Sequence, residues 1–499
     1  MMPIKRILPF VLAACAAVSA FGAPDDPFNS SRVSTGGRDN NAFNRNRANN
    51  FNDYRTSLNA EYARMLGERW GNFNSVRGEK APDRDVPPVP PVIWDGKDDR
   101  RDDREIVIEE VVKPQNDRSK ANPIAPVKED ADQPTKSFAF EYFGTPLSVR
   151  VPSNKSFRLS GTSGQSIAAA WNELSDPAFA CIVADVSKLK SKHRLCDWAY
   201  LKMLEAFSSK YAADPNSATL LMAYLYSQSG YKVRLATTSA SRLDMLYATQ
   251  HTLYDKIYYN LDGEKFYPYH TQGGSLEISA ARFPKEQSLS LWVQNEPEIS
   301  VSASNSRNLK SKRYPEMEFT VSTNKNLVNF YDTYPTSESG GNFLTRWAMY
   351  ANTPLSKHVR DSLYPQMKAK LSGLSELEAV ERILNWVQTA FVYEYDDKVW
   401  GGDRAFFAEE TLFYPYCDCE DRSILFTRLV RDLLGLKCIL IYYPGHLAAA
   451  VSFNSAVNGD YISHAGRRFT ITDPTYIGAR VGATMPKMDN ATAKVILLD

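Results

Sequence analysis

The sequence lacks several features that would each have decided its class. The apolar run Ile7–Ala20 is too short to span a bilayer as a stable helix and no later run is long enough, so a polytopic membrane protein is excluded. Charge of one sign is not in excess, because the formal net charge is +1 over 499 residues. This balance argues against nucleic acid as the main partner. The length exceeds what one compact core holds, so about two to four domains are expected.

Cysteine is also scarce, with 6 residues in the whole chain. That is too few for a disulfide framework in a chain of this size. Apart from Cys15, the cysteines are Cys181, Cys196, Cys417, Cys419 and Cys438. An odd number in an oxidising compartment leaves at least one thiol outside any disulfide, as a nucleophile requires. Pairing of Cys181 with Cys196 stays open, and Cys438, in an apolar strand, is predicted to be a buried hydrophobe.

The N-terminus has the pattern of an export signal. Lys5 and Arg6 precede the short apolar run, which predicts a secretory signal over residues 1–22. A second interpretation stays open, because Leu12–Cys15 resembles a bacterial lipobox, whose signal ends before Cys15. The protein is therefore expected in the periplasm or at the outer membrane, with membrane contact only through a lipid anchor at Cys15.

Residues 23–135 are predicted to be a disordered tether. Ser30–Asn52 is rich in Asn, Arg, Ser and Gly, Val86–Val92 has polyproline character, and Asp95–Glu105 is a mixed-charge run. One helix near 53–70 interrupts this composition, since apolar residues recur there at helical spacing. It either docks onto the body of the molecule or binds a partner.

Three folded regions are expected to follow. Residues 136–280 begin with a hairpin and continue as a helical α+β domain, residues 281–342 are β-rich, and residues 343–499 form the last domain. Ser217–Arg234 and Asp421–Cys438 share one order, an amphipathic helix followed by a glycine and a strand start. The region 136–280 is accordingly interpreted as a degenerate copy of the last domain that lacks its nucleophile.

The chemistry-bearing residues lie between Tyr414 and Thr475. Cys419 falls at the start of an amphipathic helix, where exposed backbone N–H groups and the helix dipole favour a thiolate. His446 opens the strand that follows, and Asp473 closes the neighbouring strand. This order supplies a nucleophile, a base and a group that orients the base.

These motifs carry a family resemblance. Cys419-Glu-Asp-Arg, Pro444-Gly-His446 and Asp473-Pro-Thr resemble the transglutaminase-like superfamily of papain-related folds, in a bacterial exported member. The resemblance covers residues 355–490 and implies an α+β catalytic domain at the C-terminus with a Cys-His-Asp triad. The family usually has a glycine shortly before its cysteine, where this chain has Tyr416-Cys417-Asp418. Its exported members include peptidases and amidases as well as cross-linking enzymes.

Other residues are secondary candidates for the site. Gln388 and Trp400 carry N–H groups that suit a second oxyanion donor. The acidic set Asp403, Asp418, Glu420 and Asp421 has the oxygen ligands that calcium prefers, although its spacing is not that of an EF-hand. No other cofactor is expected. Cys417 competes with Cys419 as nucleophile, and the helix start favours Cys419.

Two functions are consistent with these observations. The first is an exported thiol enzyme that cleaves or transfers at amide bonds of a protein, peptide or peptidoglycan substrate. Hydrolysis is favoured over cross-linking, because water is the default acceptor. The second is a catalytically inactive transglutaminase-fold protein that binds or scaffolds in the cell envelope.

Overall fold

The fold is mixed α+β, which confirms the predicted class. The computed structural model describes residues 54–82, 88–96, 102–115, 119–127, 129 and 132–499. The predicted signal over 1–22, Cys15 and Ser30–Asn52 lie outside the described residues. No helix in the described part of the chain combines the length and apolarity that a membrane span needs.

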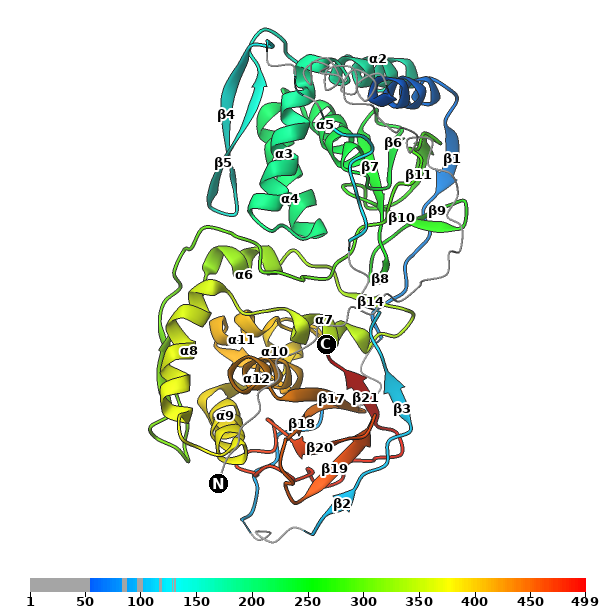
Figure 1. Cartoon of the computed structure of the whole chain (residues 1–499). Helices are drawn as coiled ribbons and strands as arrows, with labels where there is room; N and C mark the ends of the chain where they lie inside the picture. Colours follow the sequence, from blue (N-terminus) through cyan, green and yellow to red (C-terminus); the bar gives the residue numbers. More distant parts are fainter. Residues whose placement is uncertain (1–53, 83–87, 97–101, 116–118, 128, 130–131) are drawn as a thin grey trace, which may run out of the picture. The chain divides into compact units, whose positions relative to one another are not determined.

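The first large sheet has the strand order β1-β11-β6-β7-β10-β9 (Figure 1). Its strands are β1 (Gly71–Asn74), β6 (Val233–Thr237), β7 (Leu243–Ala248), β9 (Tyr259–Leu261), β10 (Glu264–Pro268) and β11 (Ser275–Ile278). Helix α5 (Pro215–Gln228) packs on β6 and β7. The helices before it are α2 (Gly164–Leu174), the 3-10 turn η1 (Pro177–Phe179), α3 (Ala180–Lys192) and α4 (Asp197–Tyr211).

The second large sheet has the strand order β3-β21-β17-β18-β20-β19-β2. Its strands are β2 (Arg104–Glu105), β3 (Glu110–Val112), β17 (Lys437–Tyr443), β18 (His446–Ser452), β19 (Asp460–His464), β20 (Arg467–Thr472) and β21 (Lys494–Leu497). Helix α12 (Cys419–Leu434) packs on β17 and β18 and against α9 (Glu376–Ala390). The other helices of this region are α7 (Thr345–Asn352), α8 (Lys357–Leu371), α10 (Asp396–Val399) and α11 (Ala408–Phe413).

The two sheets share one order of strands. β11-β6-β7-β10-β9 in the first corresponds, place for place, to β21-β17-β18-β20-β19 in the second, and every neighbouring pair in both runs is antiparallel. Each run also follows a helix that packs on two of its strands. Helix α5 packs on β6 and β7, and helix α12 packs on the corresponding strands β17 and β18. The outermost additions differ, because β1 joins β11 antiparallel whereas β3 joins β21 parallel.

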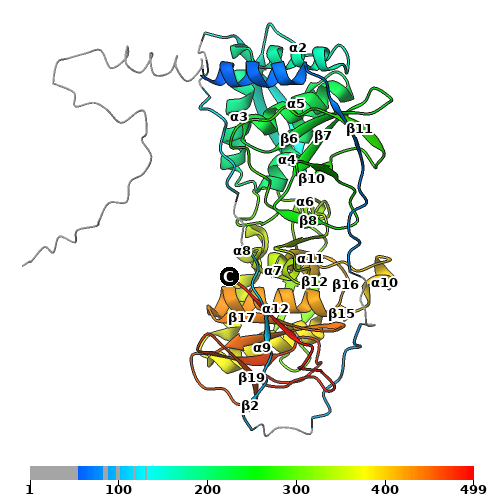
Figure 2. The same cartoon turned by 90° about the vertical axis from the view of Figure 1, so that its right-hand side faces the viewer.

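The prediction of a disordered tether over 23–135 is wrong for the described residues of that stretch. The helix predicted near 53–70 spans 54–66 and buries Tyr62, Ala63 and Leu66. Strands β1, β2 and β3 then add to the edges of the two sheets, and Figure 2 shows β2 beside β19. Edge pairing uses backbone groups, so the mostly polar residues of β1 and β2 can take part in it. Around β3 the side chains contribute too, because Ile106, Ile108 and Val112 are buried. The charged run is also paired, since Arg104 contacts Asp460 at 2.5 Å.

The expected hairpin is confirmed as β4 (Thr135–Tyr142) and β5 (Thr145–Pro152). The region 281–342, expected to be β-rich, holds three strands, β12 (Arg307–Lys310), β13 (Glu318–Val321) and the short β14 (Ser337–Ser339), together with helix α6 (Lys325–Tyr331). β14 pairs with β8 (His251–Leu253), which lies outside the region. The alternating residues 289–293 lie in irregular chain that is buried on both sides, so alternation there did not produce a strand.

Candidate functional site

Cys419 is the first residue of α12, as its position in the sequence predicted. Asp418 precedes the helix, and the backbone N–H of Asp418 donates to the Asp421 carboxylate at 3.1 Å. The helix ends at Gly435, whose left-handed φ of 69° suits glycine. The Cys419 side chain is buried, at 3% exposure, because the apolar face of α12 packs against β18.

His446 begins β18 directly opposite the last residue of β17, Tyr443. Its ring is fully buried, and Nε2 lies 2.8 Å from the Asp473 carboxylate. Nδ1 is also buried and has no hydrogen-bond partner among the described residues. A buried ring nitrogen without a partner is uncommon and marks a place where a ligand or a reacting group is expected.

Asp473 is held in place by the chain that follows β20. Its Oδ1 accepts the backbone N–H groups of Thr475 at 2.8 Å and Tyr476 at 3.3 Å, and its Oδ2 faces His446. Since an ionised carboxylate only accepts, Nε2 of His446 carries the proton and donates it to Oδ2. The lone pair then lies on Nδ1, which makes this atom the basic one.

Cys419 and His446 line one cavity of about 440 Å³. The sulfur of Cys419 lies 3.2 Å from an oxygen of the Glu420 side chain. The structure thus places the three predicted residues together, with Asp473 behind the imidazole and Cys419 on the wall that His446 shares.

Gln388 is positioned as a brace and not as an oxyanion donor. Its Nε2 donates to the carbonyl oxygens of Asp473, Tyr476 and Ala479 at 2.8–3.2 Å, and its Oε1 accepts from the N–H of Gly478. The residue is buried, at 2% exposure, and not on a solvated face of α9. Its amide is fully used in tying α9 to the segment that holds Asp473, so the expected oxyanion role is wrong.

Trp400 lies away from the thiol. Its ring packs against Phe406 and Tyr414, with the Arg404 guanidinium 4.4 Å from its centre. It lines a different cavity, of about 420 Å³, whose lining does not include Cys419. The structure therefore does not bring Trp400 to the site as expected.

Carboxyl groups gather beside Cys419. Ligand oxygens of Asp396, Asp418 and Asp421 lie within 4.8 Å of one another, as do those of Asp396, Asp403 and Glu420. Burial, reinforced by the neighbouring acids, raises the pKa of Asp418 and of Asp421 well above the ordinary range. These oxygens could hold a cation of the calcium type, and without one the same crowding favours protonated carboxyls.

Three residues near the thiol were missed in the sequence. Asp396 joins the acidic group from α10, while Arg346 and Trp347 on α7 line the thiol cavity. No motif marks the last two, because α7 lies more than 60 residues before Cys419 in the sequence. The only available signal was their presence in a short amphipathic helix, which is typical of ordinary core packing.

The other described cysteines are thiols in ordinary surroundings. The Cys417 sulfur lies 3.8 Å from the carbonyl oxygen of Val392, across the paired strands β15 (Val392–Tyr393) and β16 (Tyr416–Cys417). Burial raises its pKa and that of Cys438, the latter to about 12. Cys181 and Cys196 form no disulfide. The predicted buried role of Cys438 is confirmed.

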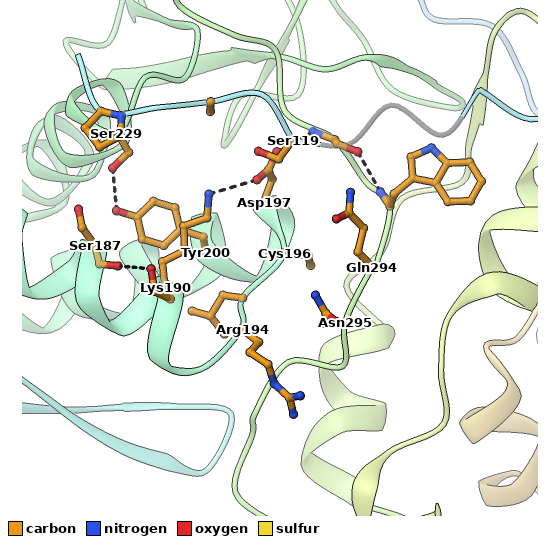
Figure 3. A pocket seen from close by; sticks show the side chains of 16 residues that line it. Ser119, Ser187, Lys190, Arg194, Cys196, Asp197, Tyr200, Ser229, Gln294 and Asn295 are labelled. Carbon is orange, nitrogen blue, oxygen red and sulfur yellow. Dashed lines mark hydrogen bonds and ion pairs between the residues drawn. The ribbon is translucent and has the colours of Figure 1, made fainter. Parts of the chain in front are cut away.

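A cavity of about 450 Å³ adjoins the start of α4, where Cys196 is the residue before the helix (Figure 3). Its charged groups are paired, because Lys190 and the Tyr231 hydroxyl both donate to the Asp197 carboxylate and Arg194 pairs with Glu298 at 3.1 Å. The sulfur of Cys196 contacts the Tyr334 hydroxyl at 3.2 Å. This cavity therefore has a thiol at a helix start but no histidine in its lining.

No family model, curated protein or solved structure matches this chain. The chemistry of the site therefore has to be argued from its own atoms. A thiol at a helix N-terminus, a histidine with a free basic nitrogen on the same cavity, and a carboxylate fixing the tautomer can together perform acyl transfer through a thioester.

Proposed function

We propose that this protein is a thiol enzyme acting on amide bonds, with Cys419 as nucleophile, His446 as base and Asp473 as its orienting partner. One observation carries the proposal: His446 uses Nε2 on Asp473, keeps a buried Nδ1 without a partner among the described residues, and lines the same cavity as Cys419. His251 and His358 also have a buried ring nitrogen without such a partner, but neither residue lines this cavity.

In the proposed reaction, His446 Nδ1 takes the proton of the Cys419 thiol, and the sulfur attacks the amide carbonyl. The C–N bond breaks, the imidazolium gives its proton to the leaving amine, and a thioester remains on Cys419. Water, deprotonated by the same nitrogen, then releases the acid and restores the thiol. An amine could resolve the thioester instead, but hydrolysis is favoured because no amine site is distinguished.

The transglutaminase-like superfamily remains the proposed relationship. Support comes from the order of Cys419, His446 and Asp473 on a helix, a first strand and the end of the next strand, all packed as one unit. The N-terminal segment supports export, and hence a protein, peptide or peptidoglycan substrate in the envelope, with or without a lipid on Cys15. Calcium at the acidic group beside Cys419 is the one cofactor we consider.

The second candidate is an inactive binding or scaffold protein, and one contact favours it. The Cys419 sulfur lies against Glu420 within the acidic group, and a carboxylate there opposes a thiolate. A cation bound at the acidic group would remove this objection.

Trapping the acyl-enzyme separates the two candidates. The purified protein is mixed with a panel of peptide and peptidoglycan-fragment amides, and thioester adducts are located by mass spectrometry after acid quench. The proposal predicts an adduct on Cys419 that Cys419→Ala abolishes and that the matched Cys417→Ala variant retains. Absence of any adduct across the panel, with the fold intact, supports the scaffold instead.

A further inference from the structure

Two buried N–H donors belong to side chains at consecutive positions of α7. Both side chains are on the wall of the thiol cavity, the cavity that Cys419 and His446 line. The Nε of Arg346 and the Nε1 of Trp347 each have no hydrogen-bond acceptor among the described residues. Buried donors without acceptors are costly, about 1–3 kcal/mol each, so their persistence at one cavity indicates a missing acceptor.

The Arg346 guanidinium is held rigidly in this position. It lies 4.0 Å from the ring centre of Phe343 and 4.8 Å from that of Trp347, and its Nη2 contacts the Asp403 carboxylate at 2.5 Å. The Trp347 ring in turn stacks on Tyr442 at 5.5 Å. A planar guanidinium fixed by stacking loses little freedom when a ligand binds, which suits recognition of a planar anion.

The other charged groups on the wall are already engaged. Lys494 pairs with Glu110 at 2.9 Å, and Glu420 contacts the Cys419 sulfur. Asp403 contacts the Nη2 group of the Arg346 guanidinium, and the Nε–H group of the same side chain keeps no acceptor among the described residues. A ligand carboxylate at this edge would supply acceptors for both remaining N–H groups.

We propose that Arg346 and Trp347 form a carboxylate-binding subsite in the cavity of Cys419, so that the preferred substrate is an amide that carries a free carboxylate. This inference rests on the proposed function, because only an enzyme has a substrate. The binding of a carboxylate, however, does not require that Cys419 be reactive.

The test therefore uses the full chain with Cys419→Ala, which has no nucleophile. Glutarate and its uncharged analogue glutaramide are titrated by calorimetry. We expect glutarate to bind roughly tenfold or more tightly than glutaramide, the range that a charge-assisted hydrogen bond supplies. Added Arg346→Gln should abolish that preference, and Trp347→Phe, which keeps the ring but removes the N–H, should reduce it several-fold.

Arg404→Gln is the matched control. Arg346 and Asp403 also line the second cavity of about 420 Å³, whereas Trp347 lines only the thiol cavity and Arg404 only the second one. Equal binding of the two ligands overturns the inference. So does a preference that Arg404→Gln removes and Trp347→Phe leaves unchanged, because the carboxylate would then bind in the second cavity.

A second measurement works on the wild-type thiol. Iodoacetate and iodoacetamide alkylate sulfur by the same displacement of iodide and differ in the carboxylate. The ratio of their rates at Cys419 should fall at least tenfold in Arg346→Gln. A reactive Cys419 with an unchanged ratio overturns the subsite and leaves the proposed function standing, while an inert Cys419 with selective glutarate binding does the reverse.

Discussion

The two large sheets of this protein share one strand order but differ in the residues at corresponding positions. In the second sheet Ala449 of β18 pairs with Thr472 of β20, and in the first Leu246 of β7 pairs with Pro268 of β10. Counting three residues back along β18 and β7 from these pairs reaches His446 in one sheet and Leu243 in the other.

The rest of the triad corresponds in the same way. One residue after the paired strand comes Asp473 in the second sheet and Tyr269 in the first. The first residue of the packed helix is Cys419 in α12 and Pro215 in α5. At these three positions the first sheet with its helix α5, here called the first half, carries proline, leucine and tyrosine. The second sheet with its helix α12, here called the second half, carries the proposed nucleophile, base and orienting acid. That 136–280 is a degenerate copy of the last domain remains our proposal, and the shared strand order is the observation behind it.

The cavities differ accordingly. The corresponding place in the first half, between Asn216, Leu243 and His270, is hollowed by about 120 Å³, against about 440 Å³ at Cys419. The comparison teaches that the shared fold provides the helix start and the strand ends, while function depends on which side chains stand there. The predictions below test this contrast, from the largest expected effect to the smallest.

Replacing the orienting acid should have the largest effect. Asp473→Asn cannot accept the Nε2 proton in the same way and favours the other tautomer, so the rate of Cys419 alkylation should fall by a factor on the order of 10²–10⁴. The matched change at the corresponding position of the first half, Tyr269→Phe, should leave the rate unchanged. Site-resolved mass spectrometry gives both rates, and equal losses would contradict the assignment.

Removing the brace should destabilise the second half. Gln388→Ala removes the side-chain donor to three carbonyl oxygens and the acceptor of the Gly478 N–H, and of these carbonyls that of Tyr476 keeps the backbone N–H of Ala479. We expect a loss of about 3 kcal/mol in the free energy of unfolding. Urea denaturation measures this loss. Thr389→Ala, on the same helix, is the control and should cost less, since its hydroxyl accepts from the backbone N–H of Lys312 at an exposed site.

Buried carboxyls should give the second half a pH dependence of stability. Burial raises the pKa of Glu409 to about 7. A raised pKa in the folded state means that this group's stabilisation is fully present below about pH 4.5 and lost as pH rises to 7, by about 3 kcal/mol. Glu409→Gln should flatten the stability profile in that window, measured by denaturation at stepped pH. Glu410, whose pKa is also raised to about 7, should leave a residual slope.

The smallest effect is expected at Cys196. Cys196→Ser keeps a hydrogen-bonding group toward the Tyr334 hydroxyl, so the free energy of unfolding should change by less than about 1 kcal/mol. Labelling of Cys419 should not change. A loss of Cys419 reactivity in this variant would show that the cavity in Figure 3 takes part in the chemistry.

Much of the site could be predicted from sequence because its residues mark the ends of local elements. The helix start fixed Cys419, the strand start after Pro444-Gly445 fixed His446, and Asp473 followed from its place before Pro474. Gln388 could not be predicted, because its partners are the carbonyls of residues 473–479, brought to α9 only by tertiary folding. Arg346 and Trp347 were hidden for the same reason.

The segments between residues 71 and 112 show where amino-acid composition fails to predict structure. Residues 71–74 and 104–105 are mostly polar or charged and were assigned to a tether, yet their backbones extend the two sheets. Residues 106–112 were assigned with them although five of these seven residues are Ile or Val, and β3 within this stretch pairs with β21. Sheet-edge pairing depends on backbone donors and acceptors that no side-chain pattern reveals. The repeated strand order was similarly visible only as a helix, a glycine and a strand start, a combination that many unrelated folds share.

The central claim is that the second half holds an activated thiol and the first half does not. The most direct test is the alkylation of every cysteine of the native protein by iodoacetamide at pH 5.5, followed by mass spectrometry, with glutathione as reference. The account predicts that Cys419 reacts faster than glutathione, that His446→Ala abolishes this excess, and that Cys181 and Cys196 stay largely unmodified. Reaction of Cys419 no faster than glutathione, or no faster than Cys196, would contradict it.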